Sequence, residues 1–427
     1  MKKFVAILFC YLLFANTSVA QDVVNAQYTI DTLCSPYFGG RGYVDFGDKR
    51  ASAYIASQYE TIGLQKLNTS SYYHRFKLNV NTFPTVVNIT KNKIDLTPGR
   101  DFIVAPDCPT TIVQNLTVHM LDKALILDKK RFKKLLKLDW SKHVVLVDTM
   151  AVDKSTQKKY DKFLKKYKNP VLLKNHKKLT WSVGRNQNSK SHISFLPGVL
   201  SDLDQISLQI EAKMIHGHAA RNVVGYIPGS EQSDSFIFIT GHYDHLGKMG
   251  QKCVMPGAND NASGIAMMLD FASYYIQNPP RYSVVFVAFA AEEAGLVGSY
   301  FFVNELSSFV EPTRIRFVVN MDLMGSGQEG IMAVNGAILD KEYELLSSIN
   351  ETKKYLPQTK KRGKAANSDH YFFTESGIPA FFFYLMGPYN HYHDIDDTRE
   401  NLTLEAKSYN GSFRLIRDFI SALMSED

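Results

Sequence analysis

The sequence has 427 residues and a formal net charge of +7; 45% of its residues are hydrophobic and 21% are charged. These proportions are typical of a globular protein with a sizeable core, and the length allows one large or two ordinary domains. The spacing of the cysteines does not predict a cysteine-based metal site.

Residues 1–20 have the pattern of a secretory signal peptide. A basic start precedes a short apolar run, and small residues at 18–20 precede Gln21, so we expect cleavage after Ala20. The apolar run is shorter than the roughly 20 residues that span a bilayer, which argues against stable membrane insertion. Cys10 lies in this run without a lipid-attachment context. We therefore expect an exported protein, periplasmic or secreted.

Three cysteines follow the signal peptide, namely Cys34, Cys108 and Cys253. Export permits a disulfide, because the compartments outside the cytoplasm are oxidising. We expect the bond between Cys34 and Cys108, which leaves one thiol over.

Residues 21–95 are expected to form the first part of the main domain. From Thr29 to Leu67 the sequence reads as helical, interrupted by a glycine-rich loop at 39–42. In the helix after this loop, Asp48 is the expected N-cap and Gly63 the expected C-cap. Two alternating stretches, 73–80 and 85–89, predict strands.

The composition becomes rich in lysine from residue 96 to residue 207. Two stretches, 128–137 and 158–168, have apolar residues at helical spacing with lysines between them, and 143–148 predicts a central strand. We expect a small inserted α/β domain here. A basic face of this kind can attract nucleic acid, but the aromatic and basic residues that would bind it do not occur together here. We therefore interpret the lysines as a solvated face.

The last part of the chain, 208–427, alternates strands with helices. Strands are predicted at 222–227, 235–240, 282–289, 316–322 and 380–386, and helices at 261–276 and 402–424. This succession predicts a three-layer α/β/α fold, in which helices cover both faces of a mostly parallel mixed sheet.

Two adjacent glutamates, Glu292 and Glu293, follow the most apolar of these strands, 282–289. Ionised carboxylates at the exit of a buried strand need a cation or hydrogen-bond donors to stabilise them. Neighbouring side chains in extended chain point in opposite directions. One glutamate can therefore bind a metal while the other faces a water molecule beside it.

Further polar residues lie just past predicted strands or at a helix entrance. With the glutamate pair, the set is His242, Asp260, Glu292, Glu293, Asp322 and His393. In open α/β sheets, ligands bind at the carboxyl ends of the strands. Imidazole and carboxylate ligands without cysteine suit zinc or a similar divalent ion. The sequence therefore predicts a metal site at this edge of the sheet.

Five motifs carry a resemblance to a known family. They are Gly-His-Tyr-Asp (241–244), Gly-Ala-Asn-Asp-Asn-Ala-Ser-Gly (257–264), Ala-Glu-Glu-Ala-Gly (291–295), Asn-Met-Asp-Leu-Met-Gly (320–325) and Tyr-His-Asp-Ile-Asp-Asp-Thr (392–398). In this order they resemble the co-catalytic di-zinc aminopeptidases of the bacterial leucyl aminopeptidase and aminopeptidase Y type, peptidase clan MH. The resemblance implies a zinc-exopeptidase fold in which the lysine-rich region is a protease-associated-like insert. It also implies peptide substrates with a free N-terminus.

The resemblance implies two Zn²⁺ ions per chain, with other divalent ions possible. One ion would be held by His242, Asp260 and Asp322, and the other by Asp260, Glu293 and His393. Glu292 would be the general base. Asp244 would orient the imidazole of His242, and Asp369 and His370 would support the site from the rim. His391 is the one rival to His393.

Three alternative functions remain open on the sequence. A glutaminyl-peptide cyclotransferase shares the fold and a Glu-Glu pair but uses one zinc. A carboxypeptidase of the same superfamily differs too little in sequence to be separated from an aminopeptidase. A non-catalytic binding relative is expected to have lost metal ligands, whereas this sequence retains the full set. The sequence does not determine the oligomeric state.

Overall fold

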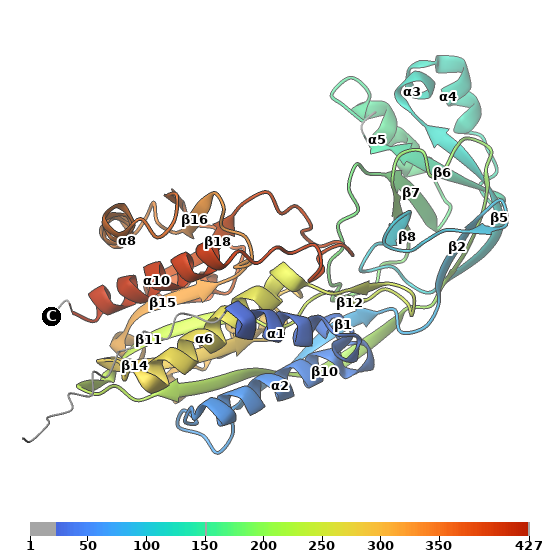
Figure 1. The fold of residues 1–427 in the computed structure, drawn as a ribbon. Helices are drawn as coiled ribbons and strands as arrows, with labels where there is room; N and C mark the ends of the chain where they lie inside the picture. Colours follow the sequence, from blue (N-terminus) through green and yellow to red (C-terminus); the bar gives the residue numbers. More distant parts are fainter. Residues whose placement is uncertain (1–22, 150–151, 426–427) are drawn as a thin grey trace, which may run out of the picture.

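The structure is a computed structural model that describes residues 23–149 and 152–425. The predicted signal peptide, residues 1–20, lies outside the described residues. Within the described part of the chain, we find no helix of the length and apolar character needed to cross a membrane. Two eight-stranded sheets organise the molecule, and the second stands at one end of the first (Figure 1).

The main sheet is mixed, and its four central strands are parallel. In spatial order its strands are β1 (Tyr73–Thr82), β10 (Lys213–Ile227), β14 (Tyr282–Phe289), β11 (Gln232–His242), β15 (Ile315–Met321), β18 (Ala380–Met386), β16 (Gly330–Val334) and β17 (Thr359–Arg362). All eight residues of β14 are buried, as expected for a strand covered on both faces. Strands β16 and β17 were not predicted from the sequence.

Helices cover both faces of this sheet, which confirms the predicted three-layer fold. One face packs against α1 (Val23–Cys34), α2 (Gly47–Ile62), α6 (Ser263–Gln277), α8 (Asp340–Lys353) and α10 (Ala406–Leu423). The other face packs against α7 (Val297–Asn304) and α9 (His370–Glu375). Alternation along β11 explains this division, because Ile237 and Ile239 face the first group while Phe238 faces the second.

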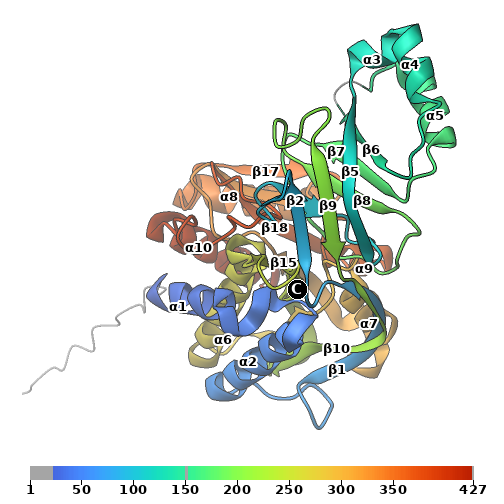
Figure 2. The same cartoon turned by 90° about the vertical axis from the view of Figure 1, so that its right-hand side faces the viewer.

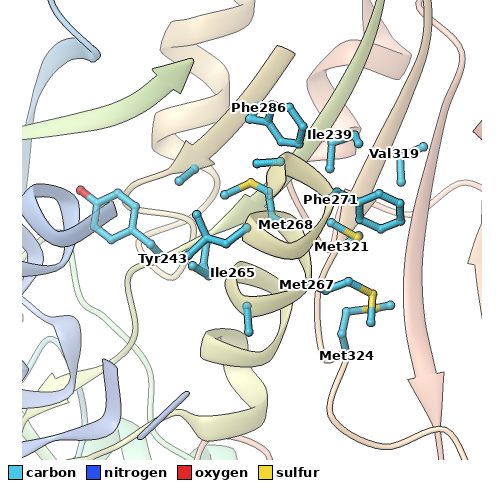
Figure 3. Close-up of a cluster of buried hydrophobic side chains, with 14 of the residues drawn as sticks. Ile239, Tyr243, Ile265, Met267, Met268, Phe271, Phe286, Val319, Met321 and Met324 are labelled. Carbon is cyan, nitrogen blue, oxygen red and sulfur yellow. The ribbon is translucent and has the colours of Figure 1, made fainter. Parts of the chain in front are cut away.

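Helix α6 forms the centre of the larger core (Figure 3). Its side chains Ile265, Met267, Met268 and Phe271 have no solvent exposure. They lie against side chains of three central strands, among them Ile239, Phe286, Val319 and Met321. Burying each such side chain contributes about 1.5–3 kcal/mol, so this contact fixes α6 and the loop that precedes it against the sheet.

The second sheet is formed by residues between Val87 and Ile210, which follow β1 and precede β10 of the main sheet in sequence. Its order is β3 (Ile94–Asp95), β2 (Val87–Lys91), β9 (Gln205–Ile210), β5 (Thr111–Leu121), β6 (His143–Asp148), β7 (Val171–Asn175), β8 (Ser191–Phe195) and β4 (Phe102–Val104). The predicted domain limits, 96 and 207, fall inside this sheet. Strand β6 lies at its centre, as predicted.

Three short helices, α3 (Lys123–Leu127), α4 (Lys129–Leu135) and α5 (Gln157–Lys166), cover one face of the second sheet (Figure 2). Phe132, Leu135 and Phe163 point into this small core, while most lysines of α4 and α5 are exposed. The opposite face packs against Leu246, Met249 and Met255 of the main domain. The two parts of the molecule therefore share a hydrophobic core.

Two local predictions in the first part of the chain are wrong. Helix α2 begins at Gly47, so Asp48 lies in its first turn and is not the N-cap. The carboxylate of Asp48 instead lies 2.6 Å from Nε2 of His218, a buried partner on β10. The predicted Cys34–Cys108 disulfide is absent because these cysteines pack against different cores, and both thiols are free. The C-cap at Gly63 is confirmed.

Arg41, in the predicted glycine-rich loop, is a fully buried arginine. Its guanidinium donates hydrogen bonds to the backbone carbonyls of Leu33, Tyr243, Pro256, Gly257 and Asp260, at 2.6–3.2 Å. These carbonyls belong to α1, to the exit of β11 and to the loop before α6. One side chain thus fastens the first helix to two loops of the later sheet.

We expect Arg41→Met to lower the free energy of unfolding by about 3 kcal/mol or more, because each buried carbonyl left without a donor costs about 1–3 kcal/mol. Denaturant unfolding of the metal-free protein measures this. The control is Arg50→Met, which removes an exposed hydrogen bond to the carbonyl of Tyr37 and a cation–π contact with its ring. Equal losses in the two variants would contradict the role of Arg41.

Candidate metal centre

The six predicted side chains meet at the carboxyl edge of the parallel strands in the main sheet. His242 ends β11, Glu292 and Glu293 follow β14, Asp322 follows β15, His393 lies in the loop after β18, and Asp260 lies in the turn before α6. All are buried or nearly so. They come together because four neighbouring parallel strands end at this edge.

Asp260 lies between the two histidines, with one oxygen toward each. Its Oδ1 is 3.4 Å from Nε2 of His242, and its Oδ2 is 3.1 Å from Nε2 of His393. Asp322 Oδ1 lies 3.3 Å from His242 Nε2, and Glu293 Oε2 lies 3.1 Å from His393 Nε2. The arrangement therefore has two halves that share a single carboxylate.

The donor atoms fit divalent cations. Atoms of His242, Glu292 and Asp322 lie within 4.8 Å of one another. The same holds for atoms of His245, Asp260 and Glu293. Such buried carboxylates require compensating positive charge, and imidazole with carboxylate oxygen is a donor set for zinc.

A relay of buried hydrogen bonds orients Asp322. Thr240 donates to Asn320 at 2.8 Å, and Asn320 donates through Nδ2 to Ser368 at 2.8 Å. Ser368 in turn donates to Asp322 Oδ2 at 3.1 Å. Because Oδ2 is occupied in this way, Oδ1 points toward His242.

Asp397 positions the loop that carries Asp260. Its carboxylate accepts the backbone N–H groups of Asn259 and Asp260, at 2.8 and 3.0 Å. Asn261 ties the same loop to the end of β15, donating to the carbonyl of Met321 at 3.0 Å. Neither role was predicted from the sequence. The only signals there are an acid within the His393 motif and an asparagine directly after Asp260.

Asp244 contacts both His242 and the glutamate pair. The Nδ1 atom of His242 lies 3.1 Å from the backbone carbonyl of Asp244 and 3.9 Å from its carboxylate. That carboxylate accepts the backbone N–H groups of Glu292 and Glu293, at 3.1 and 3.3 Å. Asp244 thus orients the histidine through its main chain and fixes the glutamate pair through its side chain.

Burial shapes the protonation of this centre. Burial, reinforced by the charges of Glu293, Asp369 and Asp322, raises the pKa of Glu292 well above its ordinary value. Burial acts in the same direction on Glu293, but His393 and His245 outweigh it and lower the pKa of Glu293 to about 2. The two adjacent glutamates therefore differ in basicity.

The centre opens into a cleft with a volume of about 280 Å³. Besides the polar centre, its walls are formed by Leu323, Arg362, Asn367, Phe382, Tyr384 and Tyr392. The ring of Tyr392 stacks on His393 at a centroid distance of 3.8 Å. Of the apolar strand 380–386, Phe382 and Tyr384 reach this cleft, whereas Phe381 and Phe383 belong to the core.

The remaining predicted residues lie around the centre. Asp369 is buried, and this burial raises its pKa to about 7. His370 packs against Phe382 at a ring distance of 5.4 Å, and its two ring nitrogens have no hydrogen-bond partner among the described residues. His391 lies away from the centre, 3.5 Å from Asp394. His245, counted as a spare histidine from the sequence, lies 2.8 Å from Glu293 Oε1.

Comparison with known proteins agrees with this site. Residues 222–419 match the model of Peptidase family M28. Aminopeptidase YwaD of Bacillus subtilis (strain 168) is 29% identical over 204 residues, which are 46% of this chain and 43% of that protein. The chain's match thus spans less than half of that relative's length.

Solved structures share the fold over nearly the whole chain. A crystal structure of BSAP, a zinc aminopeptidase from Bacillus subtilis, superposes with a TM-score of 0.69 and 19% identity, covering 94% of this chain and 95% of that one. The crystal structure of a Peptidase M28 precursor from Shewanella amazonensis SB2B gives a TM-score of 0.67 and 15% identity, covering 96% and 94%.

Fold and site together define an α/β protein with the fold of the zinc aminopeptidase structures. Residues 222–419, which carry all five motifs, match peptidase family M28. The resemblance to co-catalytic zinc peptidases drawn from the five motifs is thereby confirmed.

The buried His370 predicts a pH effect on stability. Burial lowers its pKa from 6.5 to about 4. Between these values the unfolded chain binds a proton that the folded chain does not, so this histidine destabilises the fold as the pH falls through 6.5 toward 4. The free energy of unfolding is expected to fall between pH 7.5 and pH 4 in the wild type. We expect this fall to be smaller in His370→Gln, by up to about 3 kcal/mol.

Denaturant unfolding of wild type and variant across this pH range measures the difference. The exposed His216→Gln serves as the control. A pH dependence that is identical in wild type and His370→Gln would show that His370 takes up a proton without cost.

Proposed function

We propose that this protein is an exported, zinc-dependent aminopeptidase that hydrolyses the N-terminal peptide bond of peptides. The observation that carries the proposal is the position of Asp260, whose two oxygens each face a different histidine. A carboxylate in this position is suited to bridge two ions. A cleft of about 280 Å³ is at the small end of ligand pockets, which supports binding of a chain end.

His242 and Asp322 would hold one Zn²⁺, Glu293 and His393 the other, and Asp260 both. His393 is preferred to His245 as the ligand, because its Nε2 lies 3.1 Å from both Asp260 and Glu293, whereas Nδ1 of His245 lies 3.9 Å from Asp260. His245 instead faces Oε1, the oxygen of Glu293 that is turned away from His393. It would orient Glu293 rather than bind the ion.

Two bound zinc ions would supply an acidified water and polarise the scissile carbonyl. Glu292 would take the proton of that water and pass it to the departing amine. Its position supports this role, since it lines the cleft while Glu293, the next residue, faces His393.

The direction of cleavage is tested by mass spectrometry of short peptides incubated with the zinc-loaded protein. Each peptide is supplied with a free and an acetylated amino terminus, and one begins with Gln. We expect stepwise loss of first residues from the free peptides alone. Loss of ammonia from the Gln peptide without shortening would identify a cyclotransferase, and loss from the other end a carboxypeptidase. No change with zinc bound would identify a binding protein.

The role of Glu292 is tested by substitution of the two neighbouring glutamates. We expect Glu292→Gln to keep both zinc ions and to lower kcat by at least about 100-fold, since a general base contributes 10²–10⁴-fold. By contrast, Glu293→Gln is expected to lose zinc as well as activity. Metal analysis and peptide turnover measure both effects.

The exposed Glu329→Gln is the control for the amide substitution and is expected to behave as wild type. Retained turnover in Glu292→Gln would remove this residue from the mechanism.

A further inference from the structure

The loop that joins β7 to β8 in the second sheet reaches the metal centre of the main sheet. Two reciprocal hydrogen bonds link Trp181 in this loop to His393. The backbone N–H of Trp181 donates to the carbonyl of His393 at 3.0 Å, and the Nδ1 atom of His393 lies 3.0 Å from the carbonyl of Trp181. A carbonyl can only accept, so Nδ1 carries the proton and donates.

This hydrogen bond determines which nitrogen of His393 is available to a metal. With a proton fixed on Nδ1, the neutral imidazole presents its lone pair at Nε2. That atom faces Asp260 and Glu293, at 3.1 Å from each. Trp181 therefore selects both the tautomer and the orientation that a metal ligand needs.

A second contact holds the chain on both sides of His393. Lys178, in the same β7–β8 loop, donates to the carbonyl of Asn390 at 2.9 Å and lies 3.2 Å from Oδ2 of Asp394. Lys178 is 39% exposed and Asp394 15% exposed, so the ion pair is partly shielded from solvent. Positive φ at His393, +57°, costs about 1–2 kcal/mol, which contacts of this kind help to offset.

The position of Trp181 is in turn set by the second sheet. Its indole Nε1 donates to the carbonyl of Val104 on β4 at 2.9 Å, and the residue is 5% exposed. The ring packs beside Phe83 at 6.1 Å. The second sheet cannot slide along the main domain without disturbing a shared core that includes Leu246 and Met249.

We propose that the inserted second sheet completes the metal centre, with Lys178 and Trp181 as positioning residues for His393. The half of the centre at Asp260, Glu293 and His393 then depends on the insert. The half at His242 and Asp322 is oriented by groups of the main domain, among them Ser368. This inference rests on the proposed function only in that the centre binds zinc.

The test is the zinc affinity of the double variant Lys178→Met/Trp181→Phe, which removes the lysine contacts and the indole hydrogen bond but keeps an aromatic ring. Zinc titration of the metal-free protein against a competing chelator resolves the two equivalents. We expect one equivalent to weaken by 10- to 100-fold, as for other partners of metal-bound histidines, while the other equivalent is unchanged. The Tm of the metal-free variant is expected to fall, because the buried carbonyl of Val104 loses its donor, so the readout is the difference between the two zinc equivalents.

Lys177→Met is the matched control, because Lys177 is an exposed neighbour with no hydrogen bond or ion pair to the described residues. His393→Gln is the reference for full loss of one equivalent. Wild-type affinity for both equivalents in the double variant would overturn the proposal, and so would equal weakening of both. Failure of the wild type to bind two zinc ions would instead refute the proposed function.

Discussion

The interaction on which the rest depends is the contact of one buried carboxylate with two histidines. Asp260 lies between His242 and His393, and hydrogen bonds from both outweigh its burial and hold its pKa well below the ordinary value. Because a buried anion is tolerated only where positive charge or donors surround it, the position of Asp260 has to be fixed closely. Much of the architecture near the sheet edge serves this purpose.

The supports come from distant parts of the chain. Arg41, between α1 and α2, donates to the backbone carbonyl of Asp260, and Asp397, in the loop after β18, accepts its backbone N–H. The hydrophobic core around α6 fixes the same loop against the sheet. Leu323 and Ala291, which flank site residues, have φ of +59° and +60°. Such backbone is disfavoured for residues with a Cβ, so it persists only where surrounding contacts over-determine it.

The lysine-rich insert contacts the metal centre through the loop between β7 and β8. Its lysines on α4 and α5 are largely solvated, as the sequence indicates. Its link to the chemistry is a different and less conspicuous feature, a loop whose backbone carbonyl accepts from His393. Backbone contacts of this kind place little constraint on side-chain identity, so they leave no motif to recognise.

The sequence by itself determined the strands at the centre of the main sheet and the chemistry at their ends. Buried strands such as β14 are continuous apolar runs, and parallel strands necessarily bring their carboxyl ends to one edge. His242, Asp260, Glu292, Glu293, Asp322 and His393 could therefore be predicted to meet. Strands β16 and β17 were missed because they are short and one of them, Thr359–Arg362, is mostly charged.

Only the tertiary structure decided how these residues are held. Asp48 is of a residue type that is common at helix N-caps, but in the structure its carboxylate lies beside His218, a buried histidine on β10. Asp244 was expected to orient His242, and its backbone carbonyl contacts that histidine, but its side chain accepts from the N–H groups of the glutamate pair. Arg41 and Trp181 act across more than 200 residues of sequence. Local pattern specifies elements, whereas such partners depend on how the elements pack, which no single stretch of sequence contains.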